Sequence, residues 1–273
     1  MQSSLLKICY PVLLKHPPVI RYFATAAVFD RAVKRRQRDW AASQDDVSVY
    51  EYVKAEVAYR VADRIYDVKK FFPFALDLGC GRGLMAPYIF KENVGHLMMF
   101  DMSDGLVRKA EESPEVASSS FVADEEYVPV RENCFDLIVS SLSLHWVNDL
   151  PRCLRAIRNS LREEGVFIGA MLGGDSLYQL RCSLQLADLE RRGGMSPHVS
   201  PLVKPSDVGS LLSAAGFAVI TVDVEELDIE YPSFLALLHD LQGMGESNAS
   251  YNRPLLLHRD SLLAASAIHQ VGL

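Results

Sequence analysis

The feature that most constrains the fold is a glycine-rich run, Gly79-Cys80-Gly81-Arg82-Gly83, which directly follows a short apolar segment. Residues 74–78 are typical of a buried parallel strand, and residues 84–91 are expected to continue as a helix. Glycines let the backbone turn sharply and approach a ligand closely, and a helix N-terminus offers free N–H groups. The run therefore predicts a ligand site at the end of this strand.

The rest of the chain places this run within a repeated pattern of strands and helices. Further strands are expected over 96–100, 118–123, 135–140 and 166–171, and helices over 48–68, 104–112 and 150–161. This alternation predicts an α/β fold with a mostly parallel, doubly wound, Rossmann-like sheet. After residue 172 the pattern changes to helices over 175–192, 206–216, 232–242 and 254–270, with one long strand over 217–229.

Acidic residues stand at the ends of successive expected strands. Asp101 ends the second strand, where a carboxylate can accept hydrogen bonds from both hydroxyls of a ribose. Asp124 and Glu125 follow the third strand, near the expected position of an adenine amino group. Asp77 precedes the glycines, and its charge disfavours a pyrophosphate and suits a cationic ligand. No phosphate-binding G-K-[ST] follows the glycines.

This combination favours S-adenosylmethionine, which carries a cationic sulfonium, a ribose and an adenine but no phosphate. The alternatives are a different dinucleotide fold and a fold without a ligand. The predicted cofactor-binding residues are Asp77, Gly79, Gly81, Gly83, Asp101, Met102, Asp124, Glu125 and Ser141.

Six segments carry a resemblance to a known family: 29–31, 75–83, 123–126, 140–151, 173–178 and 241–248. Across most of its length the sequence resembles class I S-adenosylmethionine-dependent methyltransferases. It resembles more closely the mitochondrial complex I assembly factor 5 family, which is related to bacterial malonyl-carrier-protein methyltransferases. The resemblance implies a matrix protein at the inner membrane that hydroxylates an arginine of an iron–sulfur subunit of complex I and works with other assembly factors.

Two other functions stay open. One is an ordinary methyltransferase acting on a carboxylate or a protein side chain, and the other is a non-catalytic assembly chaperone. The class I sheet normally ends with a seventh, antiparallel strand paired to the sixth. No β-rich segment follows 217–229, so we expect this last strand to be missing, the C-terminal region to be truncated and one edge of the sixth strand to be unpaired.

Four residues are candidates for contact with the substrate. His145 and Trp146 follow the fourth strand, where His145 can act as a base or orient a guanidinium and Trp146 can stack on it. Packing around the cofactor is the alternative for both. Asp175 and Tyr178 lie at an expected helix start, where Asp175 can pair with a substrate arginine or cap the helix.

A metal site is not predicted. His258, Asp260 and His269 have the composition of a non-haem iron site. They fall in the C-terminal helical region, however, where Asp260 is expected to be the N-cap of a helix.

The N-terminal 29 residues contain no Asp or Glu, and Arg21-Tyr22-Phe23 is typical of a mitochondrial processing site. We expect a transit peptide over 1–23, an N-terminal arm over 24–47, a core over 48–172 and a substrate-side region over 173–273. The alternative for the first residues is the N-terminal arm of a cytosolic protein. The formal net charge of −7 makes nucleic acid an improbable partner. A basic cluster at Arg31, Lys34, Arg35, Arg36 and Arg38 can touch anionic lipid or an acidic partner, or form a solvated helix face.

Overall fold

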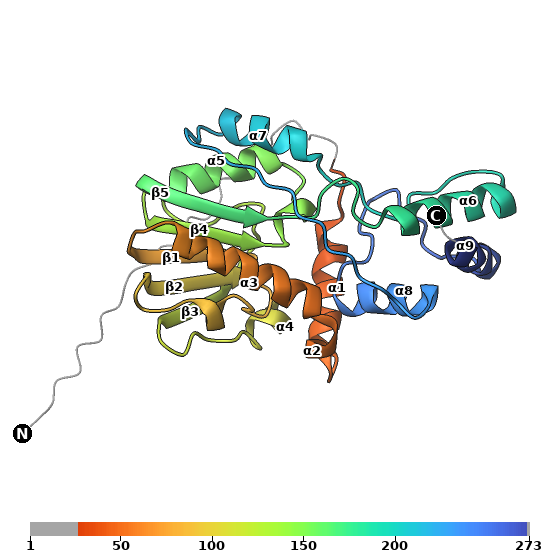
Figure 1. Cartoon of the computed structure of the whole chain (residues 1–273), viewed down its shortest axis with the longest axis horizontal. Helices are drawn as coiled ribbons and strands as arrows, with labels where there is room; N and C mark the ends of the chain where they lie inside the picture. Colours follow the sequence, from red (N-terminus) through yellow and green to blue (C-terminus); the bar gives the residue numbers. More distant parts are fainter. Residues whose placement is uncertain (1–26, 272–273) are drawn as a thin grey trace, which may run out of the picture.

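A computed structural model describes residues 27–271, so the expected transit peptide lies outside the described residues. Its centre is a sheet of parallel strands in the order β3-β2-β1-β4-β5 (Figure 1). The strands are β1 (Phe72–Leu78), β2 (Val94–Asp101), β3 (Ala117–Val122), β4 (Phe135–Ser141) and β5 (Leu161–Ala170). The predicted α/β class and the order of these five strands along the chain are confirmed.

The central strands are rich in buried apolar residues because helices cover both faces of the sheet. Ala75 and Leu137 face one core together with α3 (Tyr52–Asp67), whereas Leu76 and Ile138 face a second core together with α5 (Leu150–Ser160). All four side chains are buried. Burial of one large apolar side chain stabilises the fold by about 1.5–3 kcal/mol, so the two cores fix β1 and β4 firmly in register.

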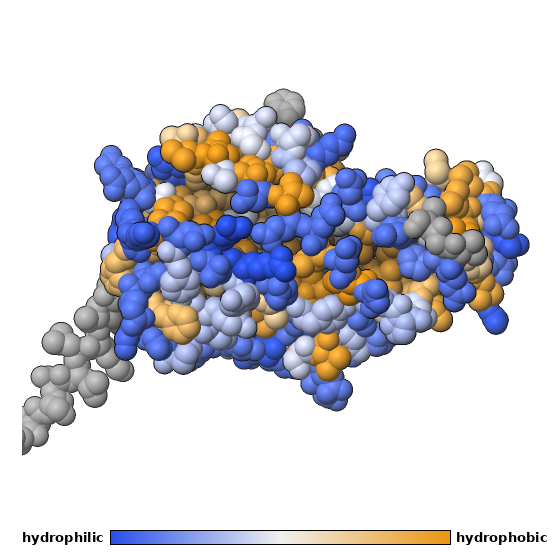
Figure 2. Space-filling model, viewed as in Figure 1, coloured by the Kyte–Doolittle hydropathy of each residue, from blue (hydrophilic) through white to orange (hydrophobic). Residues whose placement is uncertain are grey.

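The C-terminal helices form a smaller core of their own beside the sheet. They are α6 (Tyr178–Arg192), α8 (Phe234–Gly243) and α9 (Arg259–Val271), whereas α7 (Pro205–Ala214) packs on α5. Figure 2 shows apolar side chains at the end of the molecule formed by α6 and α9. Among the described residues, no helix is both long enough and apolar enough to span a membrane.

Two N-terminal helices lie beside the carboxyl edge of the sheet. They are α1 (Arg31–Ser43) and α2 (Val47–Tyr50), and α1 contacts the short helix α4 (Asp104–Val107) that follows β2. The Asp30 side chain caps α1 by accepting a hydrogen bond from the Val33 amide at 3.0 Å. Lys34 and Arg38 point inward and are buried. The interpretation of the basic cluster as a solvated face is therefore wrong for these two side chains, whereas Arg35 and Arg36 are exposed.

Two predicted helices are much shorter than expected. The segment 84–91 forms successive tight turns and one 3-10 turn, η1 (Ala86–Tyr88), with hydrogen bonds between residues three apart. Pro87 lacks the N–H that an α-helix needs and its ring obstructs the preceding turn. The segment 104–112 is helical only as α4, and beyond it the amides of Lys109 and Ala110 again bond to residues three back.

The predicted sixth strand over 217–229 is wrong, because this segment carries no strand pairing. Its expected partner is a seventh strand, and residues 27–271 contain none. The segment instead runs past α3, where Glu225 forms ion pairs with Arg60 at 2.7 Å and Arg64 at 3.1 Å. Figure 2 shows hydrophilic side chains across this part of the face.

Two helix starts also differ from prediction. The helix expected from residue 175 begins only at Tyr178, because Leu177 has a left-handed backbone (φ +59°) that interrupts any earlier turn. Asp175 is therefore not its cap. Helix α9 begins at Arg259, which places Asp260 inside its first turn rather than at the N-cap.

Candidate functional site

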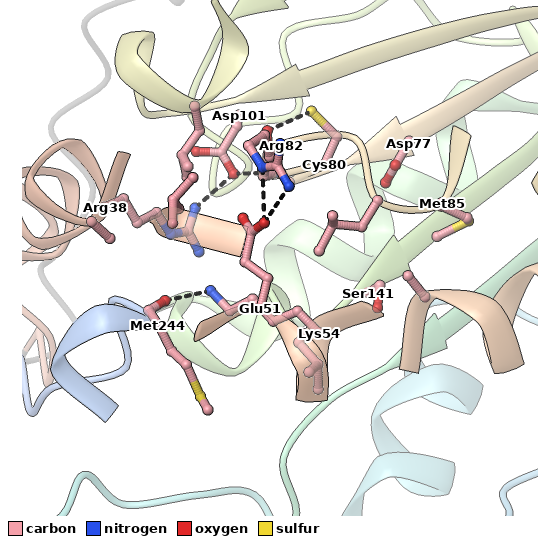
Figure 3. Close-up of a pocket in the computed structure, with 18 of the residues that line it drawn as sticks. Arg38, Glu51, Lys54, Asp77, Cys80, Arg82, Met85, Asp101, Ser141 and Met244 are labelled. Carbon is pink, nitrogen blue, oxygen red and sulfur yellow. Dashed lines mark hydrogen bonds and ion pairs between the residues drawn. The ribbon is translucent and has the colours of Figure 1, made fainter. Parts of the chain in front are cut away.

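The candidate site lies where the strand order reverses, at the carboxyl ends of β1 and β4. Ligands bind in this crevice in open α/β sheets, because the connections of neighbouring strands run in opposite directions there. A cavity of about 40 Å³ opens at this point (Figure 3). Of the predicted cofactor-binding residues, Asp77, Gly79, Gly81, Asp101 and Ser141 line it.

Three glycines in left-handed conformation shape the loop after β1. Gly81 has φ +57°, and a Cβ added there meets nothing within 4 Å, so it would project into open space. A Cβ on Gly79 would collide with the Ser143 side chain, and one on Gly83 would lie 2.8 Å from the Glu111 carbonyl oxygen. Gly83 therefore serves the packing of the loop and is not among the residues that line the cavity.

Asp77 is a buried carboxyl group inside this cavity. Its Oδ1 atom has no hydrogen-bond partner among the described residues. Burial, together with the nearby charge of Asp101, raises the pKa of Asp77 to about 7. A cationic ligand group beside Asp77 would stabilise its ionised form.

Asp101 and Glu125 are bridged by a guanidinium from α1. Arg38 Nη1 lies 3.1 Å from Asp101 Oδ2 and 2.9 Å from Glu125 Oε1, and Arg38 Nη2 donates to Ser143 Oγ at 3.1 Å. Asp101 also accepts hydrogen bonds from the amides of Gly81 and Ser103. Burial alone would raise the pKa of Glu125, but Arg38 and then Arg31 bring it down to about 2. Both acids are thus held around a buried cation.

A second arginine of α1 holds the acids after β3. Arg31 Nη2 lies 2.7 Å from Asp124 Oδ1 and 3.0 Å from Glu125 Oε1. As a result Asp124 and Glu125 are not among the cavity-lining residues, and neither is Met102, which is buried after β2. The structure brings Asp77 and Asp101 into one cavity, connects Glu125 to it through Arg38, and leaves Asp124 outside.

The chemistry of the cavity fits S-adenosylmethionine, with a condition on space. Carboxylates and a turn without side-chain bulk suit a cationic nucleoside. The carboxylates of Asp101 and Glu125 already bind one cation, the Arg38 guanidinium. Pockets for ligands of this size measure about 300–1,000 Å³, whereas this cavity measures about 40 Å³. In this arrangement the Arg38 guanidinium, and not a nucleoside, is the cation beside Asp101 and Glu125.

His145 and Trp146 lie in the short 3-10 turn η2 (Leu144–Trp146) after β4 and are both buried. Their shared partner is Glu246: Trp146 Nε1 donates to its Oε2 at 2.8 Å, and His145 Nε2 lies 3.3 Å from the same atom. Lys34 Nζ sits 3.3 Å from the centroid of a Trp146 ring. Burial lowers the pKa of His145 despite Glu246. Both residues are thus enclosed near the cavity without lining it.

Asp175 and Tyr178 are not brought to the cavity. Both are exposed and neither lines the cavity, and Tyr178 begins α6, which belongs to the C-terminal helical core beside the sheet (Figure 1). His269 packs against Phe234 and lies 3.3 Å from Ser183 Oγ. Within 27–271, no group of three or more His, Cys, Asp or Glu residues could hold a metal ion.

Sequence reasoning missed four charged residues of this region: Arg31, Arg38, Lys54 and Glu246. The sequence does contain a signal for the arginines. Arg31, Lys34 and Arg38 share one helical face, and the acids at the strand ends need basic partners if they are buried. Glu246 lies in the segment 241–248 that carries the family resemblance, but nothing in its local pattern indicated its role, and no signal indicated Lys54.

Comparison with known proteins agrees with the fold. The family described as "Methyltransferase domain" matches residues 76–169. A chain from the complex of the Haloferax volcanii Trm112 methyltransferase activator has a similar fold, with a TM-score of 0.54 and 16% identity over 76% of this chain and 93% of that chain. Fold and cavity together define a protein with a class I methyltransferase fold.

Two curated relatives narrow this class. Human "Arginine-hydroxylase NDUFAF5, mitochondrial" is 53% identical over 90% of this chain and 71% of its own length. A malonyl-[acyl-carrier protein] O-methyltransferase from Methylovorus is 29% identical over 84% of this chain and 78% of its own length. The chain belongs to the mitochondrial arginine-hydroxylase NDUFAF5 family, and the expected resemblance is confirmed.

Proposed function

We propose that the protein is a mitochondrial enzyme that binds S-adenosylmethionine and hydroxylates an arginine side chain of an iron–sulfur subunit of complex I during assembly. Membership of the arginine-hydroxylase family supports the reaction. The assignment of the cofactor depends mainly on one observation. The buried carboxylates of Asp77 and Asp101 lie at the strand ends, beside Gly81 in its left-handed conformation.

The residues that would hold the cofactor are those that line the cavity. Asp101 would accept hydrogen bonds from the ribose hydroxyls, and Asp77 would face the positively charged end of the ligand. When bound, S-adenosylmethionine supplies a sulfonium with an electrophilic methyl group. Departure of Arg38 from Asp101 would free the carboxylate oxygen that now accepts from its guanidinium.

The names of the relatives support a mitochondrial location. We propose that it works in the matrix, in peripheral contact with the inner membrane and with other assembly factors. Exposed Arg35 and Arg36 on α1 could contribute to an anionic contact, since they are the outward members of the basic cluster.

Affinity for S-adenosylmethionine should rise with pH between about 6 and about 8, since a bound cation favours the ionised form of Asp77, whose pKa is about 7. The same raised pKa makes the unliganded protein lose stability as pH rises from about 4 to about 7, because the unfolded carboxyl group ionises first. Calorimetric titration at several pH values measures the first effect. Asp77→Asn should bind with little pH dependence, and an equal pH dependence in both proteins would contradict this role.

Mass spectrometry of the candidate subunit tests the reaction. Complex I from cells that contain the protein should carry an arginine with one added oxygen, which is absent without the protein. Addition of one methyl group instead would favour the methyltransferase function, which the methyltransferase domain match over 76–169 supports. If Asp101→Asn abolishes cofactor binding but leaves assembly intact, and the subunit is unmodified with either form of the protein, the protein acts as a chaperone.

A further inference from the structure

Glu246 is a buried carboxylate that the proposed cofactor site does not use. It lies in the loop that follows α8, where the Glu246 amide bonds to the Leu241 carbonyl at 2.9 Å and turns the chain back on the helix. Gly243 packs so closely on the Tyr50 ring that a Cβ there would collide with it. Asn248 fixes the other end of the loop by donating to the Pro197 carbonyl at 2.6 Å. The loop therefore holds the carboxylate in a defined position.

The two oxygens of Glu246 have different surroundings. Oε2 accepts from Trp146 Nε1 and lies beside His145 Nε2, and both of these side chains are buried. Oε1 lies 3.0 Å from Lys54 Nζ, on the first turn of α3. The aromatic pair therefore orients the carboxylate and leaves Oε1 for a cation.

Lys54 is the partner of this carboxylate that also lines the cavity. Its ammonium donates to the Met244 carbonyl at 2.7 Å, and both Lys54 and Met244 are lining residues (Figure 3). The Lys54 side chain is 21% exposed, whereas neighbouring Lys34 is fully buried and donates to two loop carbonyls, those of Gly245 and Ser247. The Lys54 side chain thus pairs with Glu246 and lines the cavity at the same time.

We infer that Glu246 Oε1 and the Met244 carbonyl oxygen form the receptor for the guanidinium of the substrate arginine, and that Lys54 competes with the substrate for them. This inference rests on the proposed function, because it supplies that reaction with a place for its substrate. A guanidinium offers five N–H donors in a planar fork, so it can serve both acceptors at once. Displacing Lys54 replaces one positive charge by another, and no carboxylate is left buried without a cation.

Binding of a small probe tests the receptor without requiring catalysis. The probe is N-acetyl-arginine methylamide, titrated into the full chain by NMR or calorimetry. Glu246→Gln should weaken binding at least tenfold, because the carboxylate charge is lost. Lys54→Met should strengthen binding at least tenfold, because the competing ammonium is gone, and the probe should raise the thermal unfolding temperature of this variant more than that of the wild type. A purely structural ion pair would give no such gain.

Two comparisons keep the outcome decisive. Lys70→Met removes the same charge from an exposed pair with Glu164 and should leave probe affinity unchanged. A gain in Arg82→Met, which frees Glu51, without a gain in Lys54→Met would move the receptor to Glu51 and overturn the inference. Equal probe binding by wild type, Glu246→Gln and Lys54→Met would overturn it as well. If mass spectrometry finds the added oxygen but the Glu246 and Lys54 variants bind the probe like the wild type, only the receptor is refuted. If the variants change probe binding as expected but no oxygen is added to the subunit, only the proposed reaction is refuted.

Discussion

Replacement of Arg38 by methionine is expected to lower the free energy of unfolding by about 3–5 kcal/mol, as is typical when one partner of a buried ion pair is removed. Arg38 is 3% exposed and lies within hydrogen-bonding distance of Asp101, Glu125 and Ser143. Without it, two buried carboxylates face each other with one cation fewer. Urea unfolding followed by circular dichroism measures the loss.

Matched variants identify the cause of the destabilisation. Arg35→Met removes an exposed arginine of the same helix, whose nearest acid, Asp39, lies 3.9 Å away, and it should change stability by less than about 0.5 kcal/mol. Arg38→Lys keeps the charge and should recover part of the loss. S-adenosylmethionine should stabilise Arg38→Met more than the wild type, because no guanidinium competes for Asp101. Equal stability of the Arg38 and Arg35 variants would contradict the buried pairing.

Replacement of Gly81 by valine is expected to reduce affinity for S-adenosylmethionine by at least about tenfold, or ~1.4 kcal/mol of binding free energy. The side chain would project into the open space beside the cavity, where the backbone of the loop would otherwise approach the ligand. The left-handed conformation at φ +57° also strains a β-branched residue, at a cost of about 1–3 kcal/mol in stability. Calorimetric titration of the folded variant measures the affinity.

Gly193→Val separates the loss of the ligand from backbone strain. Gly193 caps α6 with φ +67°, and a Cβ there likewise meets nothing within 4 Å, but it lies outside the cavity. Its replacement should cost similar stability and leave cofactor affinity unchanged. Equal affinities of the Gly81 and Gly193 variants for S-adenosylmethionine would show that the glycine loop is not part of the cofactor site.

The acids and glycines of the cavity could be predicted because parallel strands share an edge. Once β1 and β2 are recognised, Asp77 and Asp101 must lie near each other, and the glycine turn between the strands must lie beside them. Ser141 at the end of β4 also lines the cavity, whereas Asp124 does not, because strand ends alone do not tell which side chains α1 will cover.

The basic face of α1 could be recognised from the sequence, but which acid each of its residues meets could not. Arg38 meets Asp101 across 63 residues, and His145 meets Glu246 across 101 residues. Such contacts depend on how α1 and the loop after α8 pack against the sheet. The prediction of a helix over 84–91 was wrong for a local reason that the sequence already showed, the ring of Pro87. The prediction of a strand over 217–229 was wrong because a strand needs a pairing partner as well as an apolar pattern.

A crystal structure of the full chain with S-adenosylmethionine tests the central claim most directly, because it shows where a cationic nucleoside lies. The ribose hydroxyls should lie within hydrogen-bonding distance of Asp101, the charged end of the ligand should face Asp77, and the Arg38 guanidinium should have moved away from Asp101. A nucleoside bound elsewhere on the molecule, or Arg38 still bridging Asp101 and Glu125 beside a bound ligand, would contradict the account.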